Sequence, residues 1–145
     1  MKNSFVQRMH GKMISRFFSV VAMCCGIGLT AAAETVEYWD PVGKVTNSVE
    51  AAVVTADTAT LTSGWYVVVG TVSRGSIAVN GEVNLILADG CELTAKEVAY
   101  YHSGINVASG AALNIYAQSV DADMMGQISA IGGIFAAGIG GDERG

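Results

Sequence analysis

The residues best suited to contact a ligand are aromatic, and they gather in two places. Tyr100, Tyr101 and His102 lie together in the segment KEVAYYHS (96–103), and Trp39 lies in ETVEYWD (34–40). An aromatic ring joins a large apolar face to a polar edge, which suits stacking on a sugar ring. We therefore predict Tyr100, Tyr101, His102 and Trp39 as ligand-binding residues. The alternative is a structural role. In that case the segment 96–103 is an insertion that folds back and buries its own rings, and Trp39 caps the first strands.

Two pairs of acidic residues are the candidates for catalysis: Asp89 with Glu92, and Asp121 with Asp123. Glycoside hydrolysis needs two carboxyl groups about 5–9 Å apart beside a cleft. Lyase chemistry needs Arg or Lys near the acids, and the interior of the chain holds few basic residues. Asp121 and Asp123 sit in a loop-like stretch, and no Ser-His-Asp or Cys-His grouping is recognisable. We predict no catalytic residue and no enzyme activity, and a polysaccharide lyase or hydrolase fragment is the third hypothesis.

Metal and cofactor sites are not predicted. His102 is the only histidine and Cys91 the only cysteine after residue 33, whereas a transition-metal site draws on several such ligands. Asp121 and Asp123 could share a calcium ion with backbone carbonyls, but a solvated acidic loop explains them more simply. Cys91 takes an apolar place in the sequence pattern, so we predict a small buried side chain and not a reactive thiol.

Short strands are the elements that must position these side chains. Between residues 64 and 117 apolar residues alternate with polar ones, which is typical of strands with one buried face. Turn signals separate the runs at Ser63-Gly64, Asn80-Gly81, Asp89-Gly90 and Ser109-Gly110. The predicted strands are 65–69, 71–73, 77–79, 83–87, 92–95, 105–107, 113–117 and one within 126–133, preceded by one or two strands within 51–62 that are split near Asp57.

The apolar pattern also repeats. A shift of twenty-two residues takes Val83 onto Ile105, Leu85 onto Val107 and Cys91 onto Leu113. Matching positions at a fixed period are typical of stacked structural units. We therefore predict an all-β fold, a parallel β-helix-like solenoid. The rival is a β-sandwich of hairpins, which Asn80-Gly81 would favour.

The N-terminal residues predict a secretory signal peptide. Four of the eight basic residues lie within the first sixteen positions, an apolar run follows over 17–29, and Ala31 to Ala33 provide small residues for cleavage. The run is short for a transmembrane anchor, which needs about 20 apolar residues. The predicted division is 1–33 as signal peptide, 34–63 as N-terminal cap and first strands, and 64–145 as solenoid coils that continue in a longer protein.

Charge excludes some classes of partner. After residue 33 the chain has thirteen acidic residues against four basic ones, a net charge of −9. Such a surface repels nucleic acid and anionic lipid, so we predict neither as a partner. We also predict no membrane span once the signal peptide is removed.

Several segments between 60 and 141 resemble a known class of protein. They include GWYVV (64–68), VNLILADGCEL (83–93), GINV (104–107), LNIYAQS (113–119) and AGIGG (137–141). These resemble the opening coils of large secreted bacterial repeat proteins, in which Gly-rich "AGIGG" coils build a right-handed β-helix-like solenoid. The chain departs from that pattern at 96–103 and 121–125. The resemblance implies a surface, adhesin-like or carbohydrate-associated protein and brings no catalytic motif.

Three functional hypotheses follow. The first is a non-catalytic structural or adhesin-like module, secreted or on the bacterial cell surface. The second is a carbohydrate-binding module that uses the exposed aromatic residues, and the third is the degradative enzyme. The predicted partners are host or cell-wall glycans or other surface proteins. No capping sequence is evident before Gly145, so we predict a solenoid that is incomplete at its C-terminal end and that either continues in a longer protein or assembles end to end.

Processing provides the first test. Because small residues lie just before Glu34, the mature protein is expected to begin at or near that residue. N-terminal sequencing of secreted material checks this, and recovery of Met1 as the first residue would contradict the signal peptide.

Overall fold

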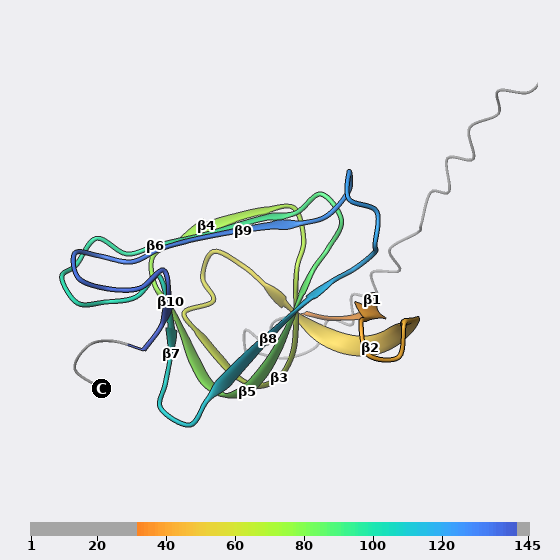
Figure 1. Cartoon of the computed structure of the whole chain (residues 1–145), viewed down its shortest axis with the longest axis horizontal. Coiled ribbons are helices and arrows are strands. Elements are labelled where there is room, and N and C mark those ends of the chain that lie inside the picture. Colours follow the sequence, from red (N-terminus) through yellow and green to blue (C-terminus); the bar gives the residue numbers. More distant parts are fainter. Residues whose placement is uncertain (1–31, 142–145) are drawn as a thin grey trace, which may run out of the picture.

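The computed structural model describes residues 32–141, and every regular element in that range is a β-strand (Figure 1). The prediction of an all-β chain is therefore confirmed for these residues. The predicted signal peptide lies outside the described residues except for Ala32 and Ala33, and Ala33 begins the first strand. The strands are β1 (Ala33–Asp40), β2 (Val45–Val54), β3 (Thr60–Val68), β4 (Thr71–Arg74), β5 (Ile77–Leu87), β6 (Glu92–Lys96), β7 (Ile105–Val107), β8 (Ala112–Ala117), β9 (Gln127–Ile131) and β10 (Ile139–Gly140).

The strands form two sheets, and the chain passes back and forth between them (Figure 1). The larger sheet has the order β1-β2-β3-β5-β7-β10, with β8 also paired to β5, and the smaller sheet has the order β4-β6-β9. Only β1 and β2 pair antiparallel; the other pairs are parallel. A parallel neighbour requires a crossover before the chain returns. The crossover from β3 to β5 contains β4 and that from β5 to β7 contains β6, whereas a loop at 55–59 joins β2 to β3.

The strand predictions from residue 65 onward are largely confirmed. The segments 71–73, 83–87, 92–95, 105–107 and 113–117 all lie within strands, and the loop between β2 and β3 contains Asp57. A sandwich of hairpins is wrong for this part of the chain, because β5 runs parallel to β3, β7 and β8. The one hairpin among the described strands joins β1 to β2 through a turn at 41–44. There Lys44 N donates to Asp40 O at 2.8 Å.

Two of the predicted turns are instead bends within long strands. Ser63-Gly64 lies inside β3 and Asn80-Gly81 inside β5, and the pairing of these strands changes register between Thr62 and Gly64. Ser63 Oγ accepts a hydrogen bond from Glu82 N at 3.1 Å. Gly81 has a φ of 95°, and a Cβ there would overlap Ser63 Oγ. Glycine therefore lets β5 bend without leaving the sheet.

The register predicted from a twenty-two-residue period is wrong. Val83 pairs with Leu113 and not with Ile105, and Leu85 pairs with Ile115 and not with Val107. Ile105 pairs instead with Ile77, before the bend in β5. The period fails because the crossovers differ in length: a loop at 97–104 follows β6, whereas only two residues separate β4 from β5.

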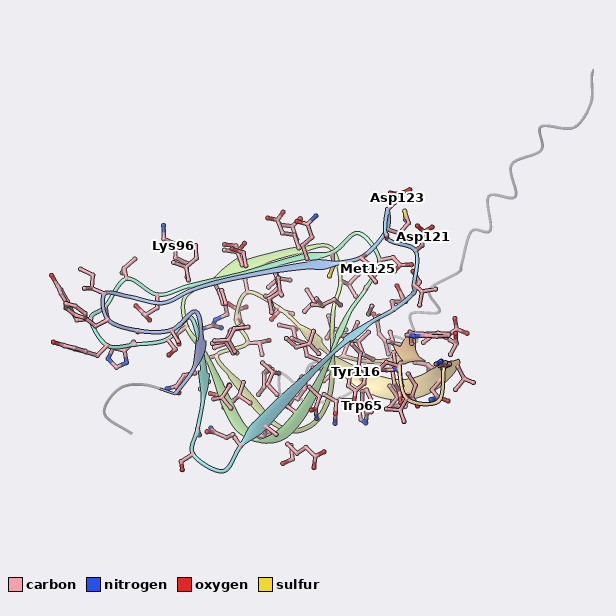
Figure 2. All side chains as sticks on the ribbon, in the orientation of Figure 1. Trp65, Lys96, Tyr116, Asp121, Asp123 and Met125 are labelled. Atoms are coloured by element: carbon pink, nitrogen blue, oxygen red, sulfur yellow. The ribbon has the colours of Figure 1, made fainter. Side chains whose placement is uncertain are left out.

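Buried apolar side chains fill the space between the two sheets. A second group of apolar side chains covers the outer face of the larger sheet. Leu85 and Leu93 are buried, with Val79, Val83 and Ile105. Trp65 does not lie in this interior, because it shares a face of the sheet with Asn84 and Asn114. Its ring centroid lies 4.7 Å from that of Tyr38 on β1 and 5.3 Å from that of Tyr116 on β8 (Figure 2). This aromatic cluster covers the outer face of the larger sheet beside the hairpin.

Leu85 and Asn84 provide a matched test of the two faces of β5. Leu85→Ala removes methyl groups from a fully buried site and should lower the free energy of unfolding by about 2–5 kcal/mol. Asn84→Ala removes only the hydrogen bond that Asn114 Nδ2 donates to Asn84 Oδ1 at 3.0 Å, so about 1 kcal/mol is expected. Chemical denaturation measures both values. Equal losses would contradict the assignment of the two faces.

Candidate functional site

Two loops lie side by side at one end of the molecule. The first spans 97–104 between β6 and β7, and the second spans 132–138 between β9 and β10. Because β6 pairs with β9 and β7 pairs with β10, both ends of the loops are held next to each other. Figure 1 shows the two loops extending together beyond the sheets at the end opposite the β1–β2 hairpin.

Backbone hydrogen bonds join the two loops along their length. Glu97 N donates to Ile131 O at 2.8 Å, Tyr101 N to Ile134 O at 3.0 Å and Gly133 N to His102 O at 2.9 Å. Gly133 is packed so closely that a Cβ there would overlap the carbonyl oxygen of Ala99. The loops therefore form a double layer in which each backbone supports the other.

Aromatic rings from both loops meet at this double layer. Tyr101 stacks on Phe135 with ring centroids 5.8 Å apart and planes 22° apart, and Tyr100 lies 6.3 Å from Tyr101. Tyr101 and Phe135 have φ values of 65° and 66°, in the left-handed region that bulky residues seldom adopt. Such a backbone persists only where the surroundings hold it, and it is often found at functional sites.

The loops expose an apolar surface, which we call the aromatic loop patch: Val98, Tyr100, Tyr101, Ile134 and Phe135. Tyr100 is 60% exposed and Phe135 is 70% exposed, while Tyr101 is half-buried between them. Exposed apolar side chains grouped on neighbouring loops are typical of interaction sites. His102 is exposed beside the patch, and Lys96 stands at its base on the end of β6 (Figure 2).

The structure brings together three of the four predicted ligand-binding residues. Tyr100, Tyr101 and His102 are consecutive in the first loop, whereas Trp39 is half-buried on β1 at the other end of the molecule (Figure 1). Trp39 therefore cannot share a ligand with the loop residues. Sequence reasoning missed Phe135 and Ile134, since only the pairing of β6 with β9 shows that their loop lies next to Tyr101.

The two candidate pairs of acidic residues do not form a second site like the aromatic loop patch. Asp121 and Asp123 lie in the exposed loop between β8 and β9 (Figure 2), where Asp121 Oδ1 accepts a hydrogen bond from Asp123 N at 3.1 Å. Asp89 Oδ1 accepts one from Ser119 Oγ at 2.9 Å, and Glu92 is exposed on β6. Within residues 32–141 no three His, Cys, Asp or Glu side chains are grouped so that they could hold a metal ion.

Cys91 is a packing residue, as predicted. Its side chain is buried in the apolar core. Burial raises the pKa of the thiol above its ordinary value of 9.0, although backbone hydrogen bonds from Gln127 and Ala88 partly oppose this. A buried thiol with a raised pKa carries little thiolate near neutral pH, so Cys91 is unsuited to nucleophilic chemistry.

Comparison with known proteins yields no relative. No protein-family model, curated protein or solved structure matches the chain. Residues 32–141 contain no helix long and apolar enough to cross a membrane.

Gly133 and Gly75 form a matched pair for testing the double layer. Gly133→Ala should force the loops apart and lower the free energy of unfolding by about 1–3 kcal/mol, because its Cβ meets the backbone of Ala99. Gly75 has open space around it, so Gly75→Ala should change the free energy of unfolding by no more than about 1 kcal/mol. Thermal unfolding measures the effect of each variant. A Gly133→Ala protein as stable as the Gly75→Ala protein would show that the loops are not packed as described.

Proposed function

We propose that this chain is a non-catalytic, adhesin-like β-solenoid module, secreted or at the bacterial cell surface, that binds glycans through the aromatic loop patch. The observation that carries the proposal is the presentation of Tyr100 and Phe135, both well exposed, by two loops that are hydrogen-bonded together. Loops held by a rigid scaffold are common binding sites.

The order of the strands supports the solenoid. From β3 to β7 the chain alternates between the two sheets, and β8, which follows β7 on the larger sheet, is succeeded by β9 on the smaller sheet and β10 on the larger one. Each strand from β5 onward pairs in parallel with an earlier strand. Stacked coils in a solenoid have this arrangement. We infer a right-handed coil, because crossovers between parallel strands of one sheet are overwhelmingly right-handed.

The chemistry of the patch supports a glycan over other ligands. The faces of Tyr100 and Phe135 offer apolar surfaces against which the C–H groups of a sugar can pack. The Tyr100 hydroxyl and the exposed His102 supply hydrogen-bonding groups for sugar hydroxyls. The net charge of −9 after residue 33 favours a neutral glycan over a polyanionic one.

A purely structural module is the second candidate. The parallel sheets support it, since a stack of paired strands can serve as a stiff spacer between other domains. In that case the aromatic loop patch contacts a protein or stays unliganded.

A glycan array of the secreted protein separates the two candidates. The paired substitution Tyr100→Ala and Phe135→Ala should weaken binding by at least tenfold, the effect of losing about 1.4 kcal/mol at a binding hot spot. Trp39→Ala is the control and should bind like the unchanged protein, because Trp39 lies far from the patch. Binding that survives the paired substitution would place the glycan site elsewhere. Binding to no glycan at all would favour the structural module.

A further inference from the structure

The first loop of the aromatic loop patch is held to its neighbour at two points. Glu97 N donates a hydrogen bond to the last residue of β9 at 2.8 Å, and Tyr101 N donates one to the second loop at 3.0 Å. Val98, Ala99 and Tyr100 lie between these points, and all three are exposed. The conformation of these three residues therefore decides how the first loop presents its part of the patch.

The Glu97 carboxylate accepts hydrogen bonds from the backbone at the start of this segment. Its Oε1 accepts from Val98 N at 2.7 Å and from Ala99 N at 2.9 Å. Strand pairing supplies a carbonyl acceptor for the N–H of Glu97 itself, and the next two N–H groups donate to the carboxylate instead. Successive N–H groups that converge on one anionic oxygen require a curled backbone. Because the acceptor is charged, each bond is stronger than one between neutral groups.

Glu97 is the only acidic residue of the two loops. Residues 97–104 and 132–138 contain no other Asp or Glu and no Lys or Arg. The Glu97 side chain is half-buried, whereas Val98 and Ala99 beside it are exposed. No other side chain of the loops could therefore take its place as an anionic acceptor for these two N–H groups.

We propose that Glu97 is the positioning residue of the aromatic loop patch, and that its carboxylate fixes the backbone that presents Tyr100. The ring centroid of Tyr100 lies 6.3 Å from that of Tyr101, which stacks on Phe135. A change in the backbone between Glu97 and Tyr101 moves Tyr100 relative to the other two rings. Rings that must be ordered during binding cost affinity, so a preformed loop favours a ligand that contacts several of them.

The role of Glu97 in binding rests on the proposed glycan site, whereas its effect on the loop does not. The two are therefore measured separately, the loop by hydrogen exchange without a ligand and the binding with a glycan selected on the array.

Hydrogen exchange of the protein without a ligand tests the loop. Glu97→Ala should speed the exchange of the Val98 and Ala99 amides by about tenfold or more, because both lose their acceptor. Glu97→Gln keeps an oxygen acceptor at the same place and should restore most of the protection. Glu92→Ala is the matched control, since Glu92 is exposed at the start of β6, and it should leave both amides unchanged. Unchanged exchange in the Glu97→Ala protein would overturn the proposal.

Glycan affinity tests whether the loop conformation serves the patch. Glu97→Ala should raise the Kd at least about tenfold, Glu97→Gln should raise it by less than about threefold, and Glu92→Ala should leave it unchanged. Thermal unfolding of the same variants should show that each is folded at the temperature of the binding measurement.

Two results of the affinity measurement would overturn the positioning role. One is a Glu97→Ala protein that binds as tightly as the unchanged protein although its amides exchange faster. The other is an equal loss for Glu97→Ala and Glu97→Gln, which would show that the charge contacts the ligand itself. A protein that binds no glycan contradicts the proposed function and removes the role of Glu97 in binding, while hydrogen exchange alone decides its role in the loop.

Discussion

The fold depends on the parallel pairing of β5 on both of its edges. One edge binds β3, and the other binds β7 and β8 in succession. Parallel pairing cannot be made by a tight turn, so a crossover must carry the chain back before the next parallel partner of a strand begins. The strands of the smaller sheet lie on those return paths, which is why β4, β6 and β9 also pair in parallel. The apolar interior between the sheets follows from this constraint, because parallel pairing in register places the apolar residues of each strand next to those of its partner.

The same constraint positions the aromatic loop patch. The loops at 97–104 and 132–138 leave the sheets from β6 and β9, which are neighbours, and return through β7 and β10, which are neighbours too. The strand pairing thus aligns the backbones of the two loops. The hydrogen bonds between the loops, and the close approach at Gly133, then hold Tyr101 and Phe135 in a backbone conformation that costs each of them energy. A surface supported in this way can meet a ligand with little further ordering.

Much of the strand content could be predicted from sequence, but the pairing could not. Alternation of apolar residues located β5, β6 and β8, because period-two burial is a local property of a strand. The register depended on crossover lengths that vary along the chain, so the apparent twenty-two-residue period paired Val83 with the wrong partner. Asn80-Gly81 has the sequence of a turn, but its glycine bends a continuous strand against Ser63. Tyr100 and Tyr101 were identifiable as adjacent rings, whereas Phe135 joins them only through the tertiary pairing of distant loops.

Strand register in solution is the most direct test of this arrangement. Nuclear Overhauser contacts in isotopically labelled protein report which residues lie across from one another, at the spacing of about 4.8 Å between paired strands. Contacts in a parallel pattern are expected between the backbones of Val83 and Leu113, and between those of Ile77 and Ile105. An antiparallel pattern between β5 and β8, or contacts that pair Val83 with Ile105, would contradict the parallel pairing on which the aromatic loop patch depends.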